Sequence, residues 1–188
     1  MKLSITLGIL AALLPLVVSA ESKKAPGPNV VVIFVDDLGW TDLGCYGSRF
    51  YETPRIDHLA KQGAMFTRAY SSCNVCSPTR ASLMTGKYPQ RVGFTNWLNP
   101  RRPGGANSAA THIPIGETTI GEAFQQAGYR TGYIGKWHVG SEKIGMPKQH
   151  GFDWQMATAR HGLPGSYFHP YKRKKPSTGD VPDLENGK

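Results

Sequence analysis

The hydrophobic and polar positions of the chain predict strands that alternate with helices. Residues 29–35 (Asn-Val-Val-Val-Ile-Phe-Val) are almost continuously apolar and rich in β-branched side chains. This pattern is typical of a strand that is covered on both faces in a parallel or mixed sheet. Shorter apolar runs over residues 64–70 and 133–138 predict two further strands.

Three segments carry the signals of helix ends, with a capping residue at the start and a glycine at the stop. From cap to glycine they are residues 53–63, 77–86 and 119–128. In the second segment Ser77 is the expected N-cap and Pro78 the first helical residue. Apolar residues recur at helical spacing in the first and third segments, and we expect them to pack in the core. The order strand, helix, strand, helix predicts an α/β fold with right-handed crossovers.

The two ends of the chain differ in composition from its middle. Residues 1–20 carry Lys2, then an apolar run, then Val-Ser-Ala, which is the pattern of a cleaved secretory signal peptide. Residues 21–28 are the expected linker, and residues 171–188 form a polar, basic tail. We therefore expect an exported protein, periplasmic or extracellular, with no stable membrane association after signal cleavage.

The formal net charge of the 188-residue chain is +9, which favours acidic partners. Nucleic acid, anionic glycans and small anions are all compatible with this charge. Four of the cations lie together at residues 172–175 of the tail, where a solvated charge run is the simpler interpretation.

Three cysteines, Cys45, Cys73 and Cys76, are too few for a disulfide scaffold and leave at least one unpaired. Cys73 and Cys76 spell Cys-x-x-Cys, but no second cysteine or histidine pair is present to complete a zinc site. A redox pair remains an alternative, because such pairs also lie at helix N-termini. Against it, a redox helix usually begins at the first cysteine, whereas this helix is predicted to begin after the second.

The residues around Cys76 predict a site for an anion. Cys76 directly precedes the predicted helix, so the positive end of the helix dipole points toward it. Arg80 follows about one turn later and adds a permanent cation. The alternative is a buried cysteine in front of an ordinary helix.

Two adjacent carboxylates, Asp36 and Asp37, follow the first predicted strand. Ligands collect beyond the carboxyl ends of strands in open α/β sheets. Adjacent carboxylates repel unless a cation lies between them, and a hard cation such as calcium prefers oxygen ligands. The alternative is that these residues only cap the next turn.

Lys136 and His138 are two residues apart in the third predicted strand, so an extended chain sends them to one side and Trp137 to the other. The lysine can act as a point charge and the histidine as a proton shuttle in one anionic site. The alternative is an exposed strand edge.

Three stretches together resemble the type I, formylglycine-dependent sulfatases of the alkaline phosphatase superfamily, including the arylsulfatases. They are Cys-Ser-Pro-Thr-Arg with Leu-Met-Thr-Gly-Lys at 76–87, Asp-Asp-Leu-Gly-Trp at 36–40, and Gly-Lys-Trp-His-Val-Gly at 135–140. The resemblance extends over residues 28–171. It implies an α/β fold with a mixed, mostly parallel sheet flanked by helices, in which residues 29–170 are the N-terminal part of the catalytic domain.

The resemblance also implies roles for individual residues. Cys76 is expected to become formylglycine, the nucleophile, and to contact a calcium ion held by Asp36 and Asp37. Arg80 and Lys136 are expected to stabilise charge, and His138 to handle a proton. The implied partners are a sulfated small molecule or glycan and a formylglycine-generating enzyme, with no nucleic acid.

The sequence also departs from the family pattern. It contains no Asp-Asn dipeptide and ends at Lys188, so we expect the remaining metal ligands and a further histidine and lysine to lie beyond it, and the chain alone to be a poor catalyst. Three alternatives stay open. They are a phosphodiesterase or phosphonate hydrolase with the same nucleophile, an exported Cys-x-x-Cys redox protein, and an inactive module that binds anionic glycans.

Overall fold

The computed structural model describes residues 27–99, 110–141, 143–156, 162 and 166. The chain divides into two units, residues 1–35 and 36–188, and each is described by itself. The predicted signal peptide (1–20) and basic tail (171–188) lie outside the described residues, as does most of the linker. No helix among the described residues is long and apolar enough to cross a membrane.

Residues 27–35 of the first unit form no strand, so the prediction for residues 29–35 is wrong. Their side chains are largely exposed, with exposed fractions of 82% at Val31 and 79% at Ile33. β-Branched residues favour a pleated surface that neighbouring segments pack against, and they do not impose a strand by themselves.

The second unit begins with a short helical turn, η1 (Gly44–Tyr46), and a helix, α1 (Pro54–Gln62). Thr53 and Asp57 join them, because the Thr53 hydroxyl accepts from the Gly44 amide (2.8 Å) and the Asp57 carboxylate accepts from the Cys45 amide (2.7 Å). The first predicted helix is therefore confirmed.

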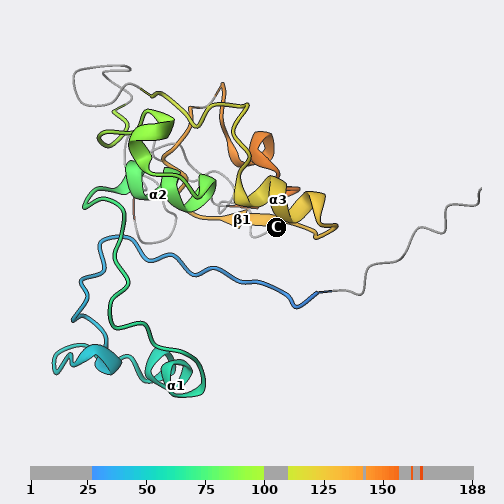
Figure 1. Cartoon of the computed structure of the whole chain (residues 1–188). Helices are drawn as coiled ribbons and strands as arrows, with labels where there is room; N and C mark the ends of the chain where they lie inside the picture. Colours follow the sequence, from blue (N-terminus) through green and yellow to red (C-terminus); the bar gives the residue numbers. More distant parts are fainter. Residues whose placement is uncertain (1–26, 100–109, 142, 157–161, 163–165, 167–188) are drawn as a thin grey trace, which may run out of the picture. The chain divides into compact units, whose positions relative to one another are not determined.

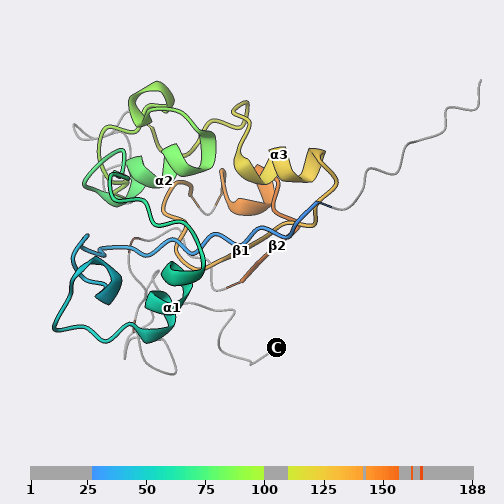
Figure 2. The same ribbon diagram turned by 60° about the horizontal axis from the view of Figure 1, so that its bottom comes forward.

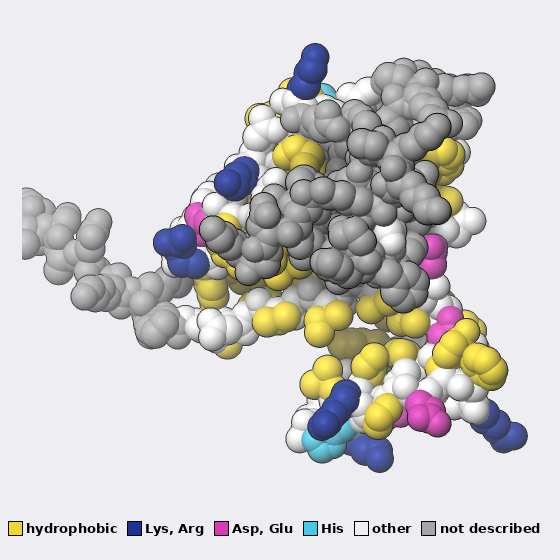
Figure 3. Space-filling view, turned by 180° about the vertical axis from the view of Figure 1, so that it is seen from behind, with side chains coloured by type: hydrophobic (Ala, Val, Ile, Leu, Met, Phe, Trp, Pro, Cys, Tyr) yellow, Lys and Arg dark blue, Asp and Glu magenta, His cyan; other side chains and the backbone are white. Residues whose placement is uncertain are grey.

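The expected packing of α1 is wrong for its two large apolar residues, since Ile56 is 42% and Leu59 62% exposed. The strand predicted over residues 64–70 is also wrong, because these residues form turns and irregular chain. Figure 3 shows hydrophobic side chains gathered on the surface around α1 and its adjoining loops. Helical periodicity marks an apolar face but does not identify what covers it.

Helix α2 runs Cys76–Thr85 and ends at Gly86, whose φ of 66° gives the left-handed turn expected of a terminating glycine. Its start differs from the prediction, because the N-cap is Val75 and not Ser77. Pro78 then lies in the first turn, where a missing amide proton costs no helical hydrogen bond. The Ser77 hydroxyl is consequently available for contacts outside its own helix.

Helix α3 (Ile120–Gln126) begins after the predicted cap residue, Thr119, which forms a capping box with Glu122. The Glu122 amide donates to the Thr119 hydroxyl (3.3 Å), and the Thr119 amide donates to the Glu122 carboxylate (2.7 Å). Ile120 packs against the core, whereas Ala123 is exposed, so the predicted apolar stripe is only partly buried.

Two strands, β1 (Gly132–Ile134) and β2 (Trp154–Met156), pair in parallel with Tyr133 opposite Gln155. Figure 2 shows them side by side, with α2 and α3 next to one another above them. Parallel pairing agrees with the expected α/β class. The strand predicted over 133–138 ends early because Gly135 turns the chain with a φ of 91°.

Figure 1 shows α2 and the segments on either side of β1, and buried side chains from these parts of the chain pack together as the core. Two short helical turns, η2 (Pro89–Val92) and η3 (Pro147–His150), also contribute buried residues. The buried hydrophobic side chains of the core are Ala81, Met84, Val92, Phe94, Leu98, Ile113, Trp137 and Val139. Because Trp137 and Val139 are both fully buried, the backbone of the residue between them is held in place.

His150 is a fully buried histidine. Its ring packs beside Trp137, with 6.0 Å between ring centroids. Burial lowers the pKa of His150 below its ordinary value. The packing of His150 against Trp137 indicates a structural role.

We predict that the free energy of unfolding falls as the pH drops below about 6.5, the ordinary histidine pKa. In that range the unfolded chain binds a proton at His150 that the folded chain rejects, and the loss ends once the pH reaches the lowered pKa of the folded state. The variant His150→Phe should show a shallower dependence between pH 7 and 5 in urea unfolding. His58→Phe, at an exposed position on α1, is the control and should keep the wild-type slope. Equal slopes for both variants contradict the prediction.

Candidate active site

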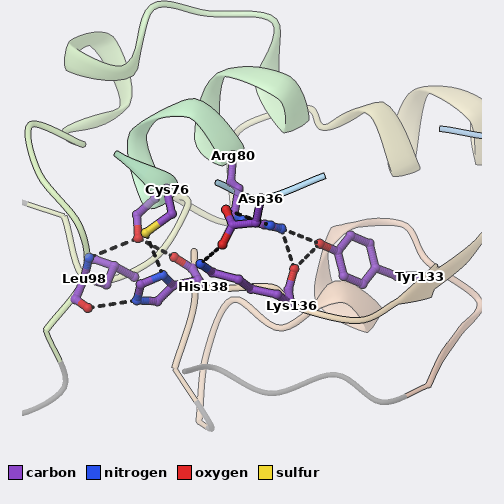
Figure 4. A network of polar contacts seen from close by, with 8 residues as sticks. Asp36, Cys76, Arg80, Leu98, Tyr133, Lys136 and His138 are labelled. Atoms are coloured by element: carbon purple, nitrogen blue, oxygen red, sulfur yellow. Dashed lines mark hydrogen bonds and ion pairs between the residues drawn. The ribbon is translucent and has the colours of Figure 1, made fainter. Parts of the chain in front are cut away.

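Five of the six residues singled out from the sequence lie in one network of polar contacts (Figure 4). Cys76 and Arg80 come from the first turns of α2, and Lys136 and His138 from the loop after β1. Asp36 comes from the start of the second unit. Asp37, the sixth, is exposed and has a positive φ of 55°.

The Cys76 thiol lies against the imidazole of His138, with 3.2 Å between Sγ and Nδ1. The other ring nitrogen, Nε2, lies 3.0 Å from the carbonyl oxygen of Leu98. A carbonyl only accepts, so Nε2 carries the proton and Nδ1 presents a lone pair to Cys76. The ring is thus oriented as a base toward position 76.

His138 is only 4% exposed. Burial lowers its pKa to about 4, although the hydrogen bond to Leu98 favours the protonated form. The imidazole is therefore neutral at pH 7. Gly162 lies against the ring, because a methyl group added there would stand 2.8 Å from Cε1 of His138.

The Arg80 guanidinium is buried and joins the helix to the loop after β1. Its Nη1 donates to the Lys136 carbonyl (2.6 Å) and lies 3.4 Å from the Tyr133 hydroxyl. Its Nη2 forms an ion pair with Asp36 at 3.3 Å. Several partners fix the orientation of this planar cation, which is the condition for directed binding of an anion.

Asp36 is paired with two cations, since Lys136 Nζ contacts its second carboxylate oxygen. Burial raises the pKa of Asp36, but the hydrogen bonds and charges of Lys136 and Arg80 outweigh this and leave the pKa below its ordinary value. The carboxylate is therefore ionised at neutral pH and holds both cations beside Cys76.

The carboxylates of Asp36 and Asp37 are the kind of ligand that calcium prefers. Two side chains alone do not fill the roughly six to eight oxygen positions of that ion. Among the described residues, no group of three or more His, Cys, Asp or Glu side chains is arranged to hold a metal. Asp36 and Asp37 therefore offer the type of oxygen ligand that calcium binds, but they are too few to complete its coordination.

Cys73 has different surroundings from Cys76. Its amide donates to the Thr79 hydroxyl (3.1 Å), and its thiol lies 3.7 Å from the Asn74 side-chain oxygen. Cys45, Cys73 and Cys76 are all free thiols in the structure. Because α2 begins at Cys76 and not at Cys73, its start lacks the geometry expected of a redox Cys-x-x-Cys helix.

The arrangement suits chemistry on an anion held next to position 76. Two cations and the positive end of α2 attract negative charge, and the neutral imidazole of His138 faces the Cys76 thiol. Comparison with known proteins agrees. The sequence model of the family described as "Sulfatase" matches residues 28–181.

The chain belongs to the sulfatase family. It is 39% identical over 180 residues to N-acetylgalactosamine-6-sulfatase of Rattus norvegicus, covering 92% of the chain and 33% of that protein. It is 42% identical over 142 residues to arylsulfatase A of Bos taurus, covering 74% and 27%. The chain thus spans about a third of the length of these relatives.

A solved sulfatase from Pseudoalteromonas sp. has a similar structure, with a TM-score of 0.60 and 36% identity. The match covers 74% of this chain and 28% of that protein. The α/β sulfatase fold expected from the sequence is therefore confirmed, and the two short parallel strands belong to that architecture.

Lys136 and His138 lie in the same network as Cys76, but the strand geometry predicted for them is wrong. Both side chains join the site (Figure 4), and Trp137 between them is fully buried in the core. However, the chain is not extended there, because β1 ends at Ile134 and His138 has a φ of 57°. Leucine and tyrosine carry no catalytic signal in a sequence, so the contributions of Leu98 and Tyr133 were missed.

We predict that Tyr133→Phe destabilises the chain by about 1 kcal/mol, the net value of one hydrogen bond. The half-buried Tyr133 donates its hydroxyl proton to the Lys136 carbonyl (2.5 Å), and burial raises the pKa of this hydroxyl, which keeps the donor proton in place. The ring itself stays packed edge-on against Trp137 and Phe152. Urea unfolding measures the loss.

The matched control is Tyr129→Phe, because the Tyr129 ring packs against Phe124 and no hydroxyl contact of it is found among the described residues. The control should change stability little. If the two variants lose the same free energy, the hydroxyl of Tyr133 does not support the loop.

Proposed function

We propose that the protein hydrolyses sulfate monoesters, with a formylglycine made from Cys76 as the nucleophile. The observation that carries this proposal is the contact of Cys76 with a neutral His138, beside the buried Arg80 and the half-buried Lys136, in a chain of the sulfatase family. In this proposal the Cys76 sulfur occupies the place of a hydroxyl oxygen of the hydrated aldehyde.

A hydrated aldehyde solves a problem that a thiol cannot. Attack by a thiolate on sulfur would leave a stable thiosulfate adduct on the enzyme. One hydroxyl of the hydrate attacks the sulfur instead, and the alcohol leaves. Loss of the proton from the second hydroxyl then expels sulfate and restores the aldehyde, so the nucleophile is regenerated.

His138 takes the proton of the second hydroxyl in this scheme. Its Nδ1 already faces position 76, and its burial keeps it unprotonated at neutral pH. Arg80 and Lys136 orient the sulfate and stabilise the negative charge that develops on its oxygens. Their fixed positions support this role, since Arg80 is bonded to the Lys136 carbonyl and both cations contact Asp36.

Calcium is proposed as the metal, with Asp36 and Asp37 among its ligands and the modified Cys76 in contact with it. When bound, the ion supplies positive charge for the sulfate and the hydrate. For Asp36 to serve as a ligand, its carboxylate must share or exchange its present contacts with Arg80 and Lys136.

The substrate is proposed to be a sulfated small molecule or glycan, in line with the sugar sulfatase among the relatives. A formylglycine-generating enzyme is the second proposed partner. The signal-like residues 1–20 support an exported protein, periplasmic or extracellular.

We predict an aldehyde at position 76 after co-expression with a formylglycine-generating enzyme. Trypsin releases residues 69–80, which contain both Cys73 and Cys76. Mass spectrometry of this peptide should show an aldehyde at 76 and a thiol at 73. The variant Cys76→Ala controls for modification elsewhere in the peptide. An unmodified Cys76 contradicts the proposal, and a Cys73–Cys76 disulfide supports the redox alternative.

We also predict that Arg80→Gln lowers kcat for an aryl sulfate about a hundredfold, as expected for the loss of one well-aimed charge. Cys76→Ala should cost more, because it removes the nucleophile. Arg55→Gln, at an exposed position on α1, is the matched control and should retain wild-type turnover. Equal effects of the two arginine changes would refute the role of Arg80. Faster cleavage of a phosphodiester than of the sulfate ester would favour the phosphodiesterase alternative.

A further inference from the structure

The hydroxyl of Ser77 bridges two segments that hold the His138 ring. The side chain is fully buried, and its Oγ donates to the backbone carbonyl of His138 at 2.7 Å. The same oxygen accepts a hydrogen bond from the backbone amide of Leu98 at 3.0 Å. The Ser77 hydroxyl therefore acts as a donor to one residue and as an acceptor from another, and both are distant from it in sequence.

Both residues that Ser77 contacts determine the state of the imidazole. His138 carries the ring, and the Leu98 carbonyl lies 3.0 Å from its Nε2 (Figure 4). Since Ser77 fixes the Leu98 amide and the His138 carbonyl, it sets the separation between the ring and the carbonyl that selects its tautomer. If the Leu98 carbonyl moves away from Nε2, the hydrogen bond that stabilises the Nε2–H tautomer is lost.

The backbone of His138 needs such support. Its φ of 57° is a left-handed conformation that residues other than glycine adopt only when their surroundings hold them there. The bond from the Ile113 amide to the Val139 carbonyl (2.9 Å) secures the following residue, and Ser77 secures His138 itself.

A role in capping does not account for Ser77. The N-cap of α2 is Val75, and no side chain caps this helix start. All the hydrogen bonds found for the Ser77 hydroxyl in the described part of the chain leave its own helix. The residue next to the nucleophile position is thus connected to the base and not to the helix.

We propose that Ser77 is a positioning residue, whose hydroxyl holds the His138 ring in the Nε2–H tautomer with Nδ1 directed at position 76. Its meaning for catalysis rests on the proposed function above. The positioning itself is a property of the chain with Cys76 unmodified, so it can be tested without sulfatase turnover.

Nitrogen-15 NMR of the histidine side chains at pH 7 measures the tautomer directly, with His138 assigned from the spectrum of His138→Gln. The wild-type chain should show His138 almost wholly as Nε2–H. In Ser77→Ala the ratio of Nε2–H to Nδ1–H should fall about tenfold, the scale of one hydrogen bond. Ser77→Thr keeps the hydroxyl and should restore the wild-type ratio.

Ser82→Ala is the matched control, because it removes a serine hydroxyl from the same helix that bonds only to the Lys87 carbonyl (2.8 Å) among the contacts found. It should leave the His138 tautomer unchanged. A Ser77→Ala protein that is less stable but keeps the wild-type ratio overturns the proposal, because Ser77 is then only a packing residue.

If Ser77→Ala does not fold, two measurements on the wild-type chain test the proposal: the tautomer of His138 and the exchange of the Ser77 hydroxyl proton with solvent. An Nδ1–H ring at His138, or a Ser77 hydroxyl proton that exchanges freely with solvent, overturns the proposal. A protected hydroxyl proton together with an Nε2–H ring supports it. An absent aldehyde at position 76 together with the expected tautomer shift would reject the proposed function and leave the positioning role standing.

Discussion

The site depends on hydrogen bonds that tie the loop after β1 to the first turns of α2. Ser77 donates to the carbonyl of His138 (2.7 Å) and Arg80 donates to the carbonyl of Lys136 (2.6 Å). These bonds hold a loop that leaves the strand at Gly135, where φ is 91°. Buried Trp137 anchors the same loop from its other side. The described residues of the loop form no strand, so no strand pairing fixes its backbone. The hydrogen bonds from α2 therefore keep its side chains directed toward Cys76.

The charges in the network complement one another. Asp36 neutralises one of the two positive charges of Arg80 and Lys136, and His138 adds none because its pKa is about 4. The network as drawn in Figure 4 therefore keeps a net positive charge next to the start of α2. Like-charge repulsion between the two cations is relieved by Asp36, which allows both to stay close to position 76 without an anion present.

The sequence predicted features whose cause is local and missed those whose cause is tertiary. The cap residue Thr119 and the terminating Gly86 were identified correctly, because caps depend on a few adjacent residues. The strand over residues 29–35 was wrong, since strands depend on distant partners. Ser77 was assigned to the wrong role for a related reason. Its type and position fit an N-cap, and only the folded chain shows that its hydroxyl bonds to Leu98 and His138.

The protonation state of His138 bears on which nucleophile position 76 can use. A thiolate nucleophile is usually stabilised by a protonated histidine, and His138 with a pKa of about 4 is neutral at pH 7. A neutral Nδ1 serves a different purpose, because it accepts a proton from a donor group and leaves that group polarised. It can accept from the thiol of Cys76 or from the hydroxyl of the proposed aldehyde hydrate, and in that proposal only the hydrate is regenerated after sulfate transfer. A neutral imidazole lacks the positive charge that would stabilise a thiolate, and it can serve as the base for the hydrated aldehyde that we propose at position 76.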